Sequence, residues 1–201
     1  MLFRQATIKD DVAGMIFQAA PDLISYIFSF EDSSIEGFLD YDFKRGNGIF
    51  GYKNLFVSEY EGEIVACLTA YCGHRYARLS LATMISILRF FKFKQIIQII
   101  RRSLVAAKLF KSPSRKAVYI ANGFVSPNYR LPGVFSSLVG CGEGLAKKNK
   151  LKVLECDVSY KNERSLKVHQ FFGFKITDEF PYNGSEPLLD GVRRLRLQIE
   201  D

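Results

Sequence analysis

A hairpin pattern early in the chain constrains the fold more than any other sequence feature. Two apolar runs, residues 55–60 and 64–71, flank the polar turn Glu61-Gly62-Glu63. Runs separated in this way pair as neighbouring antiparallel strands. Because helical and strand patterns are mixed along the rest of the chain, the hairpin favours an α+β fold in which helices cover one sheet.

Local signals place the other elements. Asp10 and Asp11 are suitable N-caps for a first helix, Pro21 restarts that helix, and Ser33 or Ser34 begins a further one. The length of 201 residues predicts a single domain, residues 1–201. Further strands are expected at 2–8, 117–125, 151–159, 175–180 and 192–199, and further helices at 133–148 and 162–172.

Charge is distributed unevenly along the chain. Residues 64–142 contain 12 lysines and arginines and no acidic residue, although the whole chain has 21 acidic residues and a net charge of +7. This basic half should meet an anionic partner. Nucleic acid is not the expected partner, since no aromatic stacking motif lies on a predicted strand.

A basic helical insertion, residues 78–111, is the most unusual part of this region. Helical spacing predicts that its second half buries the side that carries Phe93, Ile96, Ile100 and Leu104. Three interpretations remain open. The insertion is a solvated cationic face, or it caps a substrate site or forms a homodimer interface, or it lies on a membrane surface.

Cysteine and histidine usage gives no sign of a metal site. The four cysteines form no CxxC pair, and the chain has only two histidines. We therefore expect free buried thiols and no metal, as in an intracellular, cytoplasmic protein. The N-terminus lacks the apolar stretch of a signal peptide, and Arg89, Lys92 and Lys94 interrupt the most apolar segment, so no transmembrane helix is expected.

One turn has the residues of a phosphate site. Residues 125–136 lie between a predicted strand and a predicted helix, and they include Arg130 and Gly133. Free backbone N–H groups at a helix start, the helix dipole and one arginine together suit a pyrophosphate. Pro132 removes one N–H group, but its fixed φ suits a turn. An ordinary strand-to-helix turn explains the segment equally well when it is considered alone.

This segment resembles the acyl-CoA signature of the GNAT N-acetyltransferase superfamily. In that family a strand ends in Val-x-Pro and the following turn reads Arg/Gln-x-x-Gly-x-Gly/Ala. Val125, Pro127, Arg130 and Gly133 stand at the matching positions.

A second element of the same family follows after the next predicted strand. It consists of Asn162, then Ser165 where the family often has alanine, then His169 where it usually has tyrosine, and the closing pair Gly173-Phe174. The resemblance at residue level therefore covers residues 119–174. Two motifs in the family's order are more specific than either motif alone.

The resemblance implies a GNAT-like fold, with one mixed, mostly antiparallel sheet flanked by helices and the insertion between the third and fourth strands. It implies an N-acetyltransferase without a metal. Such an enzyme transfers an acetyl group from the co-substrate acetyl-CoA directly to a primary amine of a small molecule or peptide within a ternary complex. The alternative is a non-catalytic binding module of the same fold, which would hold an anionic ligand or a membrane surface.

The resemblance also assigns residues to the site. Phe124 and Val125 would line the acyl arm, Asn162 would hydrogen-bond the pantetheine, and Ser165 would allow its close approach. The phosphate cradle would consist of Arg130, Leu131, Gly133, Val134, Phe135 and Ser136. The sequence departs from the family at two points. Phe135 replaces a small residue of the turn, and residues 117–125 hold no acid where the family has a glutamate base.

His169 is the candidate catalytic residue, as the acid that protonates the departing thiolate, because an imidazole titrates near neutral pH. The alternative is a partly buried helix histidine that a backbone carbonyl satisfies. Cys141 and Cys156 are not expected to carry an acyl group, since neither has a neighbouring base in the sequence. Five acidic residues either attract a cationic acceptor or form a solvated face: Glu31, Asp32, Glu36, Asp40 and Asp42.

Overall fold

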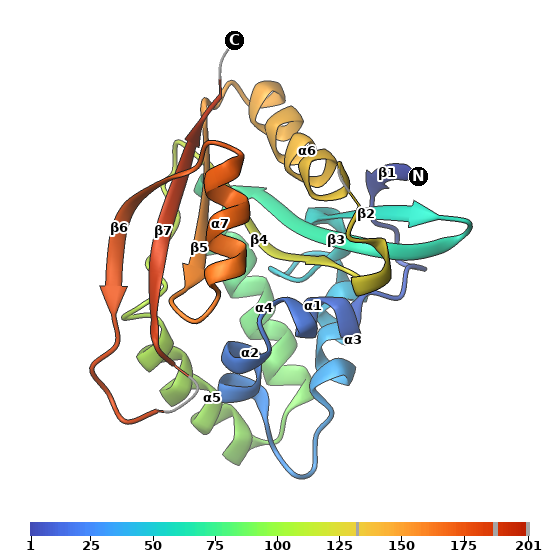
Figure 1. Cartoon of the computed structure of the whole chain (residues 1–201). Helices are drawn as coiled ribbons and strands as arrows, with labels where there is room; N and C mark the ends of the chain where they lie inside the picture. The colour runs from blue at the N-terminus through green and yellow to red at the C-terminus, as the bar shows by residue number, and fades with distance from the viewer. Residues whose placement is uncertain (132, 187–188, 200–201) are drawn as a thin grey trace.

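The computed structural model describes residues 1–131, 133–186 and 189–199, so Pro132 of the candidate turn lies outside the described part (Figure 1). The strands are β1 (Leu2–Gln5), β2 (Leu55–Tyr60), β3 (Glu63–Cys72), β4 (Val118–Val125), β5 (Val153–Ser159), β6 (Lys175–Pro181) and β7 (Gly191–Gln198). The helices are α1 (Ala13–Ala19), α2 (Pro21–Phe28), α3 (Ile35–Arg45), α4 (Tyr76–Phe90), α5 (Phe93–Ala106), α6 (Val134–Lys148) and α7 (Glu163–Phe171). Three short 3-10 helices are η1 (Tyr52–Asn54), η2 (Gly73–Arg75) and η3 (Pro127–Tyr129).

The seven strands form one sheet in the order β1-β2-β3-β4-β5-β7-β6. Strands β4 and β5 run parallel, and every other neighbouring pair in this order is antiparallel. The expected α+β class, with a mixed and mostly antiparallel sheet, is therefore confirmed. Helices α4 and α5 occupy the expected place between the third and fourth strands.

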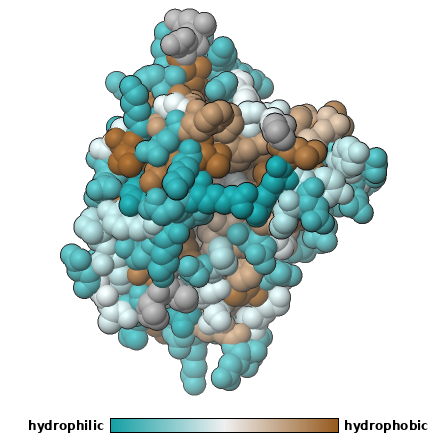
Figure 2. Space-filling model, viewed as in Figure 1, coloured by the Kyte–Doolittle hydropathy of each residue, from teal (hydrophilic) through white to brown (hydrophobic). Residues whose placement is uncertain are grey.

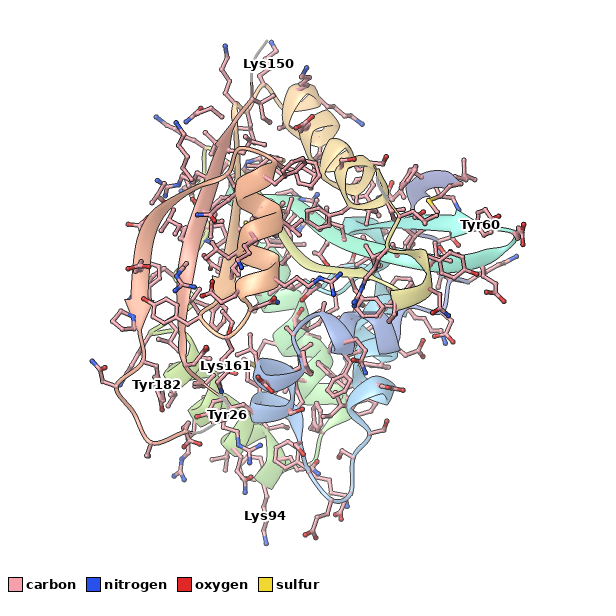
Figure 3. The ribbon with its side chains drawn as sticks, viewed as in Figure 1. Tyr26, Tyr60, Lys94, Lys150, Lys161 and Tyr182 are labelled. Carbon is pink, nitrogen blue, oxygen red and sulfur yellow. The ribbon has the colours of Figure 1, made fainter. Side chains whose placement is uncertain are left out.

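The hairpin between β2 and β3 forms at the predicted turn. Glu61 and Gly62 have φ angles of 52° and 86°, so both adopt the left-handed backbone conformation that a tight two-residue hairpin turn requires. At the end of this hairpin, Tyr60 lies 5.7 Å from the ring of Tyr129 in η3 (Figure 3). The hairpin thus contacts the segment that precedes α6.

Helix starts confirm some local signals and correct one. Pro21 begins α2, and the Ser34 hydroxyl caps α3 by accepting the N–H of Gly37 at 3.0 Å. The expected aspartate cap of α1 is wrong, because its N-cap is Val12. Asp10 instead accepts two hydrogen bonds from the guanidinium of Arg4, at 2.7 and 2.9 Å, and an ion pair across the chain replaces the local cap.

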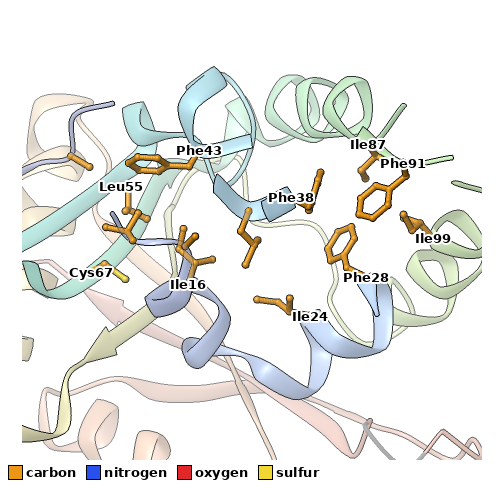
Figure 4. Packing of buried hydrophobic residues seen from close by; sticks show 14 of the residues in the cluster. Ile16, Ile24, Phe28, Phe38, Phe43, Leu55, Cys67, Ile87, Phe91 and Ile99 are labelled. Atoms are coloured by element: carbon orange, nitrogen blue, oxygen red, sulfur yellow. The ribbon is translucent and has the colours of Figure 1, made fainter. Parts of the chain in front are cut away.

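Two apolar clusters pack on opposite faces of the sheet. One cluster joins α1 to α5 with alternate residues of β2 and β3, and Figure 4 shows Ile16, Phe28, Phe38 and Ile99 pointing into it. The other cluster packs α6 and α7 against the remaining face. The central strand β3 is covered on both faces, which explains its nearly continuous apolar sequence.

The insertion corrects the predicted burial of its second helix. The buried positions of α5 include Gln95, Ile96 and Ile99, whereas Phe93 is 76% exposed and Leu104 is 65% exposed. The prediction that Phe93, Ile100 and Leu104 lie inward is therefore wrong. The apolar residues of α5 do follow helical spacing, but spacing does not decide which side of the helix is buried. That depends on the neighbouring elements, and α2 packs against the side that carries Ile99. Among the described residues, no helix is both long enough and apolar enough to cross a membrane.

Candidate functional site

The parallel strands β4 and β5 separate soon after they meet. Their ladder consists of the pairs Val118–Leu154 and Tyr119–Glu155, and the strands diverge toward their carboxyl ends (Figure 1). A bulge in β4 adds to this divergence, since the pairing with β3 changes register near Asn122, which has a φ of 50°. Backbone groups of β4 that face β5 beyond Tyr119 are thus left without ladder partners.

A pocket of about 500 Å³ lies at this divergence. Its walls come from β4, β5 and α7 on one side, and from the α1–α2 junction and the end of the insertion, Leu109 and Phe110, on the other. Figure 2 shows hydrophobic side chains gathered around α6 and α7 and a band of hydrophilic side chains across the middle of the molecule. The polar residues that line the pocket include Tyr119, Asn122, Asp157, Asn162, Ser165, His169 and Asp190.

The predicted phosphate turn lies beyond this pocket, at the start of α6. Gly133 is the N-cap of the helix and has a φ of 93°, a conformation that only glycine adopts without strain. Arg130 is exposed and its Nε donates to the carbonyl of Val125 at 3.2 Å, which holds the guanidinium over the turn. Since α6 begins at Val134, the N–H groups of Phe135 and Ser136 lack helical acceptors and can serve an anion, whereas the N–H of Val134 donates to the Leu131 carbonyl at 3.4 Å.

Phe135 does not place its bulk on the turn. Its ring lies 5.2 Å from the ring of His169 and 5.8 Å from that of Phe172. It also lies 3.5 Å from the position that a Cβ atom on Gly123 would take, which places the ring beside β4. The side chain that departs from the family pattern therefore packs between β4 and α7 rather than over the helix start.

The other predicted residues divide into two groups. Phe135, Asn162, Ser165 and His169 all line the pocket. The remaining predicted residues form the end of β4 and the turn before and into α6: Phe124, Val125, Arg130, Leu131, Gly133, Val134 and Ser136. Among these, Val134 is buried, whereas Arg130 and Leu131 are exposed.

Helix α7 presents Asn162, Ser165 and His169 to the pocket. The Asn162 Oδ1 atom accepts the N–H of Ser165 at 3.0 Å, so this side chain caps the helix and keeps its amide N–H groups for another acceptor. His169 is buried, with the edges of Phe135 and Phe174 each at 5.2 Å. Its Nδ1 atom lies 2.8 Å from the Ser165 carbonyl oxygen.

This last contact fixes the tautomer of His169. A carbonyl oxygen only accepts, so Nδ1 carries a proton and the neutral ring has its lone pair at Nε2. Burial lowers the pKa of His169 below its ordinary value of 6.5, and the hydrogen bond to Ser165 opposes this shift only in part. The neutral ring accepts a proton at Nε2, and it can donate one there only after it has received one.

A buried ionic network lies where β4 and β5 are still paired, and the sequence analysis did not predict it. Arg194 on β7 makes two hydrogen bonds of 2.8 Å to the carboxylate of Asp157 on β5, and Tyr119 donates to the same carboxylate at 2.9 Å. Glu155 accepts from Arg196 at 2.8 Å. Burial, followed by the nearby charge of Asp157, raises the pKa of Tyr119 well above 10.0, so its hydroxyl stays protonated.

The sequence contains the charged residues of this network in two separate strands, β5 and β7. Glu155 and Asp157 alternate on β5, Arg194 and Arg196 alternate on β7, and the strand register pairs each acid with an arginine. The same arginine, Arg194, donates to the carbonyl of Ser112 at 3.1 Å, which fixes the exit of the insertion to the sheet. Two alternating strands of opposite charge could have suggested the pairing once β5 and β7 were known to be neighbours.

The cysteines are free thiols in the structure. Cys156 lines the pocket, but burial raises the pKa of its thiol well above 9.0, and burial also raises the pKa of Cys141. Neither is therefore an activated nucleophile. Within residues 1–131, 133–186 and 189–199, no group of three or more His, Cys, Asp or Glu could hold a metal ion.

The acidic residues before the hairpin do not form one cluster. Asp42 is fully buried and accepts from the hydroxyls of Ser86 and Thr83, at 2.5 and 3.1 Å. It therefore joins α3 to α4, which corrects both interpretations that placed it on a surface. Asp32 and Asp40 form exposed ion pairs with Lys92 and Lys44.

The sheet order, the diverging central strands and the turn before α6 define the fold of the GNAT N-acetyltransferases. No protein-family model matches the chain, and no curated protein matches it either. Solved structures match over nearly the whole length, so the resemblance predicted from two motifs is confirmed at the level of the fold.

Three of these structures are informative. An N-acetyltransferase from Staphylococcus aureus Mu50 has a TM-score of 0.75 at 17% identity and covers 98% of this chain and 100% of its own. A structure described as an acetyltransferase has a TM-score of 0.71 at 16% identity, with both chains covered completely. The structure of yncA from Salmonella typhimurium, described with its cofactor acetyl-CoA, has a TM-score of 0.56 at 15% identity and covers 100% of this chain and 95% of its own.

Proposed function

We propose that this protein is an N-acetyltransferase that transfers the acetyl group of acetyl-CoA directly to a primary amine in a ternary complex. The observation that carries the proposal is the pocket at the divergence of β4 and β5, with an anion-binding helix start beyond one end. In the reaction the amine nitrogen forms a bond to the thioester carbonyl carbon. The C–S bond breaks, and the proton lost by the amine is finally taken up by the thiolate.

The pyrophosphate, the pantetheine arm and the thioester of acetyl-CoA would each meet a different part of the chain. The pyrophosphate would lie on the N–H groups from Gly133 to Ser136, beside Arg130. The pantetheine arm would pass the end of β4, at Phe124 and Val125, and meet the free amide of Asn162 on α7. Ser165, beside it on the same face of α7, is small enough for a close approach. The unpaired backbone of β4 offers N–H groups to the thioester oxygen, which gains negative charge during the reaction.

His169 would then relay the proton of the reaction. Its neutral Nε2 takes the proton from the attacking amine as the C–N bond forms, and returns it to the thiolate as the C–S bond breaks. This role uses the tautomer that Ser165 fixes and the lowered pKa of the ring. It also supplies the base that β4 lacks, since residues 117–125 contain no acid.

A two-ligand binding experiment tests the phosphate assignment. Arg130→Ala should weaken acetyl-CoA far more than S-acetylpantetheine, which lacks the phosphates, as measured by calorimetry on the folded variant. Arg164→Ala is the matched control, because Arg164 is an exposed arginine on α7. Equal weakening of both ligands by Arg130→Ala would place the phosphates elsewhere.

Release of the CoA thiol, measured with a panel of primary amines, tests the transfer itself. Amine-dependent thiol release is the expected result. Tight acetyl-CoA binding without thiol release for any amine would favour a non-catalytic binding module of the same fold.

A further inference from the structure

The inserted helices carry an exposed apolar stripe. On α4 it consists of Leu81, Ile85 and Leu88, and on α5 of Phe93, Ile97, Ile100 and Leu104, all more than a third exposed. Figure 4 shows Ile87, Phe91 and Ile99 of the same region pointing into the core. These residues therefore lie on sides of α4 and α5 that the domain does not cover. We call these seven residues the insertion stripe.

Basic side chains flank the insertion stripe on both helices. At about 100° per residue, Arg78 and Arg89 lie beside the stripe of α4, and Lys94 and Arg101 lie beside that of α5. Figure 3 shows Lys94 extending away from the body of the molecule. Among the described residues these four cations have no carboxylate partner, and residues 64–142 contain no acid that could provide one nearby in the chain.

The arrangement of charges indicates which kind of partner would bind this surface. A second copy of the chain would bring an identical surface of the same positive charge against this one, and like charges at an interface are unfavourable. An apolar stripe with lysine and arginine along its edge is instead the pattern of a helix that lies in the headgroup region of a membrane. Anionic headgroups attract each such cation.

We propose that α4 and α5 bind the insertion stripe and its flanking cations to the surface of an anionic phospholipid membrane. The apolar side chains enter the headgroup boundary, and the cations contact lipid phosphates and carboxylates. This interaction does not depend on the proposed acetyl transfer. It gives a use to an apolar surface on α4 and α5 that the fold itself leaves uncovered.

Sedimentation of the full-length protein with lipid vesicles tests this proposal. The protein should bind vesicles of equal parts phosphatidylcholine and phosphatidylserine, but not vesicles of phosphatidylcholine alone. Phe93→Ser combined with Leu104→Ser should abolish binding without lowering the melting temperature, because both side chains are exposed. Phe171→Ser is the matched control, since Phe171 is 85% exposed on α7, outside the insertion.

A second pair of variants tests the charge. Lys94→Gln with Arg101→Gln should weaken binding about 25-fold, since each cation near an anionic surface contributes about fivefold. Lys147→Gln with Lys148→Gln, at the end of α6, makes the same change in net charge and should have little effect. The proposal is overturned by equal binding to both kinds of vesicle, or by equal effects of the two pairs. A dimer that Phe93→Ser with Leu104→Ser dissociates would assign the stripe to a second copy.

Discussion

At the scale of single residues, His169 shows how a backbone contact decides chemistry. The residue type suggested a proton donor to the departing thiolate. The hydrogen bond from Nδ1 to the Ser165 carbonyl instead leaves Nε2 as an acceptor, and burial keeps the ring neutral near pH 7. A neutral acceptor can still protonate the thiolate, provided that it first takes the proton from the amine.

Replacing His169 by phenylalanine should lower turnover about ten- to a thousand-fold while acetyl-CoA affinity stays nearly unchanged. The phenyl ring keeps the packing against Phe135 and Phe174 but removes the acceptor. Steady-state kinetics at saturating acetyl-CoA, with a confirmed amine acceptor, measure the effect. His74→Phe is the control, because His74 is the other histidine and is exposed in η2. Full activity of His169→Tyr would contradict the relay, since a tyrosine there donates but does not accept near neutral pH.

The pH dependence of activity, compared between the wild-type protein and His169→Phe, gives a second test of the proposed proton relay. The imidazolium cannot accept a proton, so activity should fall as the pH drops through the pKa of His169. Because burial lowers that pKa, the fall should occur below pH 6.5. The corresponding limb of the profile of kcat/KM should be missing in His169→Phe, whereas the limb due to the amine substrate should remain in both. A limb that persists unchanged in the variant belongs to another group.

At the scale of elements, α5 shows that hydropathy alone does not determine which side of a helix is buried. Its apolar residues occupy more than one side of the helix, so spacing alone does not identify the side that packs. Ile99 is fully buried on the side of α5 that packs against α2, whereas its neighbour Ile100 is 39% exposed. Both residues are isoleucines at adjacent positions, and they differ only in whether the rest of the protein packs against them.

This pair provides a matched test of the packing of α5. Ile99→Asp should lower the free energy of unfolding by about 3–5 kcal/mol, since it buries an unpaired charge and opens a gap. Ile100→Asp should cost less than about 1 kcal/mol because the new carboxylate reaches water. Urea denaturation followed by circular dichroism measures both. Similar losses in the two variants would show that both sides of the helix are covered in solution.

At the scale of the whole molecule, the network around Arg194 joins parts of the chain that are distant in sequence. Arg194 connects the last strand to Asp157 on β5 and to the carbonyl of Ser112, at the exit of the insertion. It therefore holds the insertion, the diverging strands and the C-terminal strand in one arrangement. The pocket depends on that arrangement, since its walls come from all three regions.

Arg194→Leu should destabilise the protein by about 3–5 kcal/mol, because it leaves the Asp157 carboxylate buried without its partner. Combining it with Asp157→Leu should recover part of the loss, since the double variant no longer buries an unpaired charge. Urea denaturation of the wild type, both single variants and the double variant gives the coupling energy. Additive losses would mean that the pair does not interact in solution.

The sequence by itself determined the features that depend on nearby residues. The hairpin turn follows from Glu61-Gly62, the restart of α2 from Pro21, and the cap of α3 from Ser34. Gly133 marked the start of α6 because its left-handed backbone requires glycine. In each case the determining interaction spans a few residues, so the local pattern contains it. The order of these elements was enough to predict the α+β class, and the resemblance of two motifs added the particular fold.

Only the tertiary structure decided the features that depend on distant residues. The side of α5 that is buried, the pairing of Arg194 with Asp157 and the packing of Phe135 against His169 each need a partner from another element. Asp10 takes a partner other than the one its local pattern predicted, since its carboxylate binds Arg4 on β1 instead of capping α1. A residue's neighbours in space set its burial, its ion pairs and its tautomer, and a sequence pattern states only which residues are able to take such roles.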